Sequence, residues 1–155
     1  MKWITKTDKD FRGGESQLFV SSNKNETQFK AQLVAISSGE KSVGFTLAET
    51  EFSKDVFVKK DMLELKIFSK DSFVLSISLL TDKNKYQHDQ KIDKQNSLYR
   101  IPLSSLILSY RGKNFNERLT DLDEVLKIEV GVLVSRQQPP FEKGERRTYE
   151  WDLHF

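Results

Sequence analysis

The side chains best suited to catalysis do not occur in a recognised catalytic arrangement. A serine nucleophile needs a base within hydrogen-bonding reach, and the chain has only two histidines, His88 and His154. His88 is followed directly by Asp89, but adjacent residues rarely face one another productively, so we interpret both as polar surface. The sequence has no glycine-rich phosphate loop, nucleophile elbow or paired-histidine helix motif. It therefore predicts a protein that is not an enzyme.

Metal-binding side chains are also scarce. The absence of cysteine excludes disulfides and thiolate metal sites, and two histidines are too few for a convincing histidine site. Asp8 and Asp10, followed by Gly13, Gly14 and Glu15, could supply oxygen ligands to calcium. We favour a polar N-terminal turn for this stretch and expect no cofactor, although the question of bound calcium stays open.

Aromatic rings are the remaining candidates for binding chemistry, because an exposed ring can stack on a sugar or on a partner side chain. Trp3, Tyr86 and Tyr110 lie in or near predicted loops. The interpretation that we favour is that these rings fasten loops to the core of a phenylalanine-rich domain. Trp151 lies in the middle of an alternating stretch and is predicted to be buried.

Composition and charge limit the classes of partner. The 155 residues include 25 basic and 23 acidic side chains, which gives a net charge of +2. These charges are spread along the chain, whereas a nucleic-acid-binding module would show a basic stripe or patch, so we expect no nucleic acid. No apolar run approaches the roughly 18 residues of a membrane span, and no signal-peptide apolar region follows the first residues. We therefore expect no membrane span and a cytoplasmic location.

Alternation of apolar and polar residues recurs along the chain and is typical of half-buried β-strands. In the clearest stretch, 73–79, every second residue from Phe73 to Leu79 is expected to face a core, with Ser76 and Ser78 on the other side. The other predicted strands are 17–22, 27–34, 43–48, 63–67, 98–103, 128–134 and 149–155. Only 119–126 shows helical spacing, enough for a turn or two.

The number and spacing of these strands predict the fold class. About eight strands in a chain of this length favour two packed antiparallel sheets, an all-β sandwich of the jelly-roll type. No internal stretch is long or low in complexity enough to be a linker. We therefore predict a single binding domain, 1–155.

A series of short motifs occurs in a fixed order along the chain. They are Trp3, 10–17 with its Gly-Gly-x-Ser, 29–33 followed by Val43-Gly44-Phe45-Thr46, 99–106, Tyr110-Arg111-Gly112-Lys113, 128–134 and the final Leu153-His154-Phe155. In this order and spacing they resemble the family of the complex I intermediate-associated protein, a galactose-binding-like β-sandwich. Two positions depart from the family pattern: Glu49 replaces an arginine, and 139–141 reads Pro-Pro-Phe where the family has Gly-Pro-Phe.

The resemblance implies a non-enzymatic module similar to an assembly factor or chaperone, which binds a partner protein while a larger complex forms. The sandwich also resembles family 11 carbohydrate-binding modules, whose concave sheet face holds a glycan, so glycan binding is the alternative. The expected ligand contacts are Glu49, Lys66 and Arg100 at outward strand positions, with Tyr86 and Gln87 in a neighbouring loop. The sequence leaves the identity of the partner and the oligomeric state open.

Overall fold

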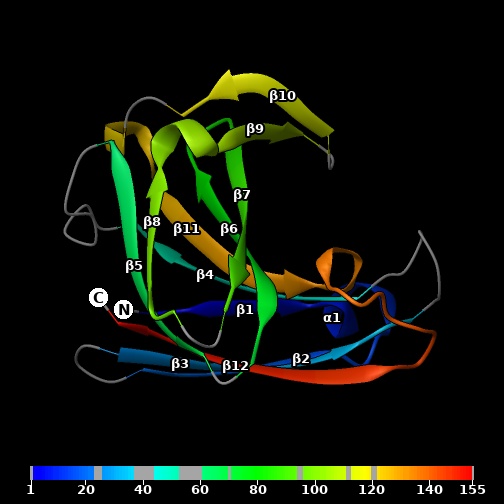
Figure 1. The fold of residues 1–155 in the computed structure, drawn as a ribbon. Helices are drawn as coiled ribbons and strands as arrows, with labels where there is room; N and C mark the ends of the chain where they lie inside the picture. The colour runs from blue at the N-terminus through cyan, green and yellow to red at the C-terminus, as the bar shows by residue number, and fades with distance from the viewer. Residues whose placement is uncertain are drawn as a thin grey trace.

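The computed structural model of the chain describes residues 2–22, 26–36, 44–52, 61–69, 71–93, 96–110, 113–119 and 122–154. Within these residues, twelve strands form two antiparallel sheets (Figure 1). The prediction of a two-sheet all-β sandwich is confirmed, whereas the expected number of about eight strands is wrong. No helix in the described part of the chain has the length and apolar character needed to cross a membrane.

One sheet has seven strands in the order β1-β4-β11-β6-β7-β9-β10. They are β1 (Ile4–Thr7), β4 (Phe45–Glu51), β6 (Phe73–Leu80), β7 (Lys85–Ile92), β9 (Ile107–Tyr110), β10 (Lys113–Arg118) and β11 (Lys127–Leu133). In Figure 1, β1 and β4 run across the view whereas β6 and β7 stand upright. The sheet therefore turns strongly between its two edges, in keeping with the twist of β-sheets.

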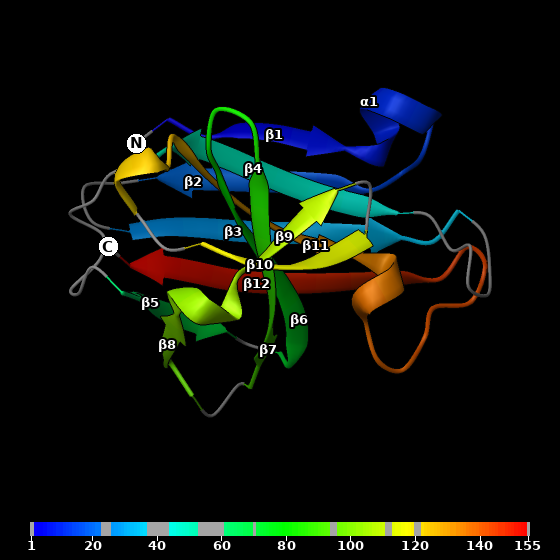
Figure 2. The same cartoon turned by 90° about the horizontal axis from the view of Figure 1, so that it is seen from above.

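The other sheet has five strands in the order β2-β3-β12-β5-β8. They are β2 (Gln17–Ser22), β3 (Glu26–Val34), β5 (Met62–Ser69), β8 (Leu98–Pro102) and β12 (Arg146–His154). Strands β2, β3 and β12 run side by side (Figure 2). The last strand of the chain thus lies in the middle of its sheet, between β3 and β5, so this sheet is complete only when the whole chain has folded.

The core lies between the sheets and follows the predicted alternation. In β6, Phe73 is 5% exposed and Leu75, Ile77 and Leu79 are fully buried, which confirms their predicted core face. Trp151 in β12 is also fully buried, as predicted, and stacks on the ring of a phenylalanine in β3 at a centroid distance of 5.1 Å. Burial of large apolar side chains of this kind contributes about 1.5–3 kcal/mol each.

Loop-fastening by aromatic rings is confirmed for one of the three candidates. Trp3 packs edge-on against Phe29, with centroids 5.2 Å apart and ring planes at 87°. Tyr86 also packs against the core, but it does so from strand β7 and not from a loop. The side chain of Tyr110 and the residues 111–112 lie outside the described part of the chain.

One element prediction is wrong and another is confirmed. The polar stretch around 85–90, interpreted as a loop, forms strand β7, which pairs with β6 along its full length and with β9 on its other side. Neighbouring strands therefore impose the strand on a sequence with little apolar character. The helical turn expected within 119–126 is confirmed as the 3-10 turn η4 (Leu122–Glu124), with Leu119 and Val125 buried and Leu126 56% exposed; residues 120–121 lie outside the described part of the chain.

The first helix was not predicted: α1 (Asp8–Arg12) forms where a polar turn was expected. Asp8 is fully buried; its Oδ1 accepts a hydrogen bond from the Ser16 amide and its Oδ2 from the Phe45 amide, both at 3.0 Å. Gly13 ends the helix at φ 66°, and a Cβ on Gly14 would lie only 2.2 Å from Asp8 Oδ1. We call this cluster the N-terminal staple, because it joins α1 to the starts of β2 and β4.

The carboxylates of this segment thus serve the chain itself. Asp10 accepts hydrogen bonds from the amide and the hydroxyl of Thr7, at 3.2 and 3.5 Å, which caps the helix. Among the described residues, no group of three or more His, Asp or Glu side chains could hold a metal ion.

Candidate functional site

The outward side of the seven-stranded sheet carries a row of aligned side chains. Residues paired in register on neighbouring strands lie on the same face of a sheet. Ile4 pairs with Glu49, Glu49 with Glu129, Glu129 with Ser78, and Ser78 with Gln87. These five residues, which we call the cross-strand row, run from β1 across β4, β11 and β6 to β7.

The middle of the row is buried although it faces away from the core. Glu49, Glu129 and Ser78 are only 8%, 6% and 3% exposed. Glu49 and Glu129 also lie directly opposite each other, and like charges in that position are destabilising unless they are neutralised.

Three lysines neutralise the two carboxylates. Glu49 receives Lys6 Nζ at Oε2 and Lys127 Nζ at Oε1, each at 3.4 Å. Glu129 Oε1 lies 3.0 Å from Lys85 Nζ. The lysine side chains are 39–49% exposed whereas the carboxylates are nearly covered. The result is a network in which the acidic groups are fixed and the ammonium groups reach solvent.

Asp89 extends this network on β7. Its Oδ1 accepts hydrogen bonds from Ser76 Oγ at 2.8 Å and Gln87 Nε2 at 3.3 Å, and its Oδ2 lies 2.9 Å from Arg136 Nε. His88, the next residue back, contacts Gln90 Oε1 at 3.1 Å instead. Successive residues of a strand face opposite sides, so His88 and Asp89 form no relay, as the sequence indicated.

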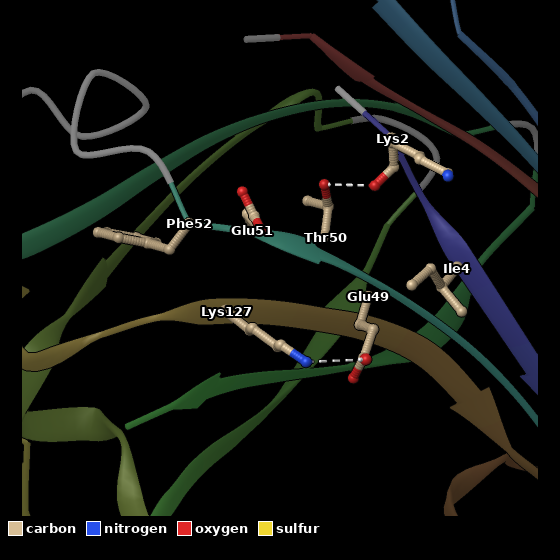
Figure 3. A pocket seen from close by; sticks show the side chains of 7 residues that line it. All are labelled: Lys2, Ile4, Glu49, Thr50, Glu51, Phe52 and Lys127. Atoms are coloured by element: carbon tan, nitrogen blue, oxygen red, sulfur yellow. Dashed lines mark hydrogen bonds and ion pairs between the residues drawn. The ribbon is translucent and has the colours of Figure 1, made fainter. Parts of the chain in front are cut away.

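A pocket of about 510 Å³ opens at the β1 end of the cross-strand row (Figure 3). Its walls come from the first residues of the chain, the end of β4 and the start of β11. The lining residues are Lys2, Ile4, Glu49, Thr50, Glu51, Phe52 and Lys127. Figure 3 shows Phe52 at one end and Ile4 at the other, with the Lys127–Glu49 ion pair between them.

The pocket combines apolar walls with charged groups. Ile4 is 52% exposed and faces the space that Phe52 borders from the other side. Thr50 Oγ1 donates a hydrogen bond to the carbonyl oxygen of Lys2 at 2.7 Å, which holds the N-terminal wall in place. A concave site of this size with apolar surface and a few polar groups is typical of ligand or partner binding.

The five residues predicted to bind a ligand are not brought together. Glu49 and Gln87 share the cross-strand row. Tyr86 points to the other side of β7, against the core, and the prediction that Tyr86 and Gln87 lie in a loop is wrong because both are in this strand. Lys66 and Arg100 lie on the five-stranded sheet, where Arg100 Nε is 3.3 Å from Glu64 Oε2.

Several residues of the site were not singled out from the sequence. Glu129 occupies an outward position of a correctly predicted strand, so its orientation could have been found from the alternation. Its position opposite Glu49 depends on β11 lying beside β4, and 78 residues separate Lys127 from Glu49. The contribution of Phe52 to the pocket had no signal in the sequence.

A second cluster closes the other end of the sandwich. Arg147 forms an ion pair with Glu145, donates hydrogen bonds to the carbonyl oxygens of Pro139 and Pro140, and places its guanidinium 4.0 Å from the centre of the Phe141 ring. The hydrogen bond from Arg147 lowers the pKa of Glu145 below its ordinary value. The Pro-Pro-Phe segment therefore lies in a loop that Arg147 fixes through two backbone carbonyls and the Phe141 ring.

Comparison with known proteins places the chain in context. A family model described as complex I intermediate-associated protein 30 (CIA30) matches residues 1–142. A family 11 carbohydrate-binding module of a cellulosomal cellulase from Clostridium thermocellum shares the fold with a TM-score of 0.56 and 12% identity, over 99% of this chain and 88% of that chain. The module from this organism in complex with a β-1,3-1,4-mixed-linked tetrasaccharide gives a TM-score of 0.56 and 11% identity, over 98% and 88%. No curated protein matches the chain.

Proposed function

The chain belongs to the complex I intermediate-associated protein 30 family, and from this premise we propose that it is a non-enzymatic module that binds a partner protein during the assembly of a larger complex. The observation that carries the proposal is the family match over residues 1–142. The partner is a protein with an apolar anchor side chain and charged groups around it, a chemistry that follows from the pocket of Figure 3.

The pocket has the composition of a protein-binding hot spot. Such sites combine apolar anchor contacts with polar and charged groups. Ile4 and Phe52 offer apolar contacts at the two ends of the pocket, and the Lys127–Glu49 ion pair lies between them. A space of about 510 Å³ is enough for a large side chain of a partner together with its neighbours.

The ion pairs along the cross-strand row argue against catalysis at this face. A general base needs a group that can exchange protons with a substrate, whereas Glu49 and Glu129 are held by lysines and Asp89 by three donors. The ring nitrogen of His88 lies against Gln90. These contacts support a binding role.

Two variants of equal exposure test the proposal. Ile4 and Phe19 are both 52% exposed, but Ile4 lines the pocket and Phe19 lies on the opposite sheet. Wild type, Ile4→Ser and Phe19→Ser are used as baits in lysate of the native cell. A recovered protein is then purified and its affinity is measured by interferometry. We expect Ile4→Ser to weaken binding at least tenfold, as loss of a hot-spot contact does, and Phe19→Ser to bind like wild type. Equal binding by all three, or no specific partner, would contradict the proposal.

Glycan binding is the alternative, favoured by one feature of the pocket. The Phe52 ring can contact the apolar face of a sugar while Glu49 and Lys127 bind its hydroxyl groups. The probe is the β-1,3-1,4-mixed-linked tetrasaccharide bound by the similar module. Calorimetric titration of wild type and Phe52→Ala decides: saturable binding that Phe52→Ala abolishes supports this alternative, and no heat at millimolar sugar rejects it.

A further inference from the structure

A groove of about 350 Å³ crosses the outward side of the five-stranded sheet, on the opposite face of the sandwich from the cross-strand row. It is lined by Phe19, Val20, Ser21, Gln28, Phe29, Lys30, Phe68, Glu150 and Asp152. Phe19 on β2 is 52% exposed and Phe68 on β5 is 49% exposed. Two large rings at this exposure flank a polar floor, which marks a candidate interaction surface.

The polar floor is ordered by strand. In one row across the sheet, Phe19 pairs with Lys30 and Lys30 with Glu150. In the next row, Ser21 pairs with Gln28, Gln28 with Asp152, and Asp152 with Phe68. In the floor of the groove, β3 therefore carries the nitrogen donors and the neighbouring β12 the carboxylates, with one phenylalanine on each flank.

This order is self-complementary. A two-fold axis that runs along the strands between β3 and β12, in the plane of contact, places β3 of one copy over β12 of the other. Lys30 then faces the second copy's Glu150, and Gln28 faces the second copy's Asp152. On each flank, β2 lies over the second copy's β5. Phe19 then lies near the second copy's Phe68, displaced by two residues along the strands, because Phe19 is in the row of Lys30 and Phe68 is in the row of Gln28. A two-fold contact repeats each of these pairs twice.

We propose that this face binds a second copy of the chain, so that the protein forms a two-fold dimer through its five-stranded sheets. The Lys30–Glu150 neighbours within one copy do not prevent it, because an ammonium group has three donors and a carboxylate about four acceptor sites. The phenylalanines on the two flanks exclude water from the charged centre. The inference does not rest on the proposed function, since it uses the other face of the molecule.

Sedimentation velocity of the chain alone, from 5 to 500 µM, measures the association. We expect the average mass to rise with concentration from 18.1 kDa towards twice that value, with a Kd on the order of 10 µM for a small interface. Phe19→Ser should raise this Kd at least tenfold. Ile4→Ser, of the same exposure on the other face, should leave it unchanged. A chain that stays monomeric at 500 µM, or equal effects of the two variants, would overturn the proposal.

Charge reversal identifies the pairing. Lys30→Glu and Glu150→Lys each place like charges opposite one another in a homodimer, so neither variant should associate. In a one-to-one mixture, each position 30 meets an opposite charge at position 150 of the other variant, and dimers should return. Lys91→Glu, an exposed reversal on the other sheet, should associate like wild type. If the mixture stays monomeric while both variants retain the thermal stability of the control, the proposed dimer is overturned.

Discussion

A methyl group added at Gly14 tests the N-terminal staple. Its Cβ would lie 2.2 Å from Asp8 Oδ1 and 2.5 Å from Asp8 Cγ. Asp8 is fully buried and accepts the amides of Ser16 and Phe45, so it cannot move without breaking these hydrogen bonds. Each buried polar group left unsatisfied costs about 1–3 kcal/mol, so the two amides together cost about 2–6 kcal/mol. A Gly→Ala change returns only about 0.4–1 kcal/mol through the unfolded chain. We expect Gly14→Ala to lower the free energy of unfolding by about 2–4 kcal/mol, near the middle of the resulting range.

Urea unfolding followed by tryptophan fluorescence measures this loss, and a thermal melt should show Tm lower by roughly 5–15 °C. Gly144→Ala is the control: φ there is +78° with nothing within 4 Å of the added Cβ, so only backbone strain of about 1–2 kcal/mol is expected. Asp8→Ala removes the carboxylate that the added methyl group would contact. The double variant, Asp8→Ala with Gly14→Ala, should therefore be no less stable than Asp8→Ala alone. Additive losses, or Gly14→Ala within 0.5 kcal/mol of wild type (the usual range of neutral surface changes), would refute the reasoning.

Three further outcomes follow from other contacts. Lys85→Met removes the ammonium group beside the nearly buried Glu129; since the lysine itself is partly exposed, we expect a loss of about 1–2 kcal/mol in urea unfolding, recovered when Glu129→Met is added. Burial raises the pKa of Tyr149 above 10.0, so folding favours its neutral form; stability should be constant below pH 10 in this respect and fall as pH rises further, and Tyr149→Phe should flatten that fall. Trp151→Ala empties a fully buried position and should cost about 3–5 kcal/mol by the same assay; a loss below 1 kcal/mol would contradict the stacked core.

Where a strand has one apolar face, its structure followed from its sequence. In β5, Leu63 and Leu65 are 0% and 2% exposed. Lys66, which lies between Leu65 and the buried Ile67, is exposed, as the period of two required. The Gly-Gly-x-Ser motif was noted as part of a family pattern, and the structure supplies a physical reason for its second glycine. Gly14 is needed because the Asp8 side chain occupies the place of a Cβ.

The candidate site could not be assembled in the same way. Tyr86 and Gln87 were interpreted as loop residues because the local composition is polar, yet β6 and β9 impose a strand there. The pairing of Glu49 with Glu129 depends on the order of strands in the sheet, which local alternation does not contain. The sequence thus supplied the inward and outward faces, while the combination of faces into one row required the topology.

The most direct measurement of the central claim is an NMR titration of the labelled chain with the purified partner recovered by the bait experiment. The account expects chemical-shift changes at Ile4, Phe52 and Lys127, which line the pocket. Resonances of Phe19 and Phe68 on the opposite face should not respond to the partner beyond their response to chain concentration alone. Shifts centred on Phe19 and Phe68, or none at saturating partner, would contradict the assignment of binding to this face.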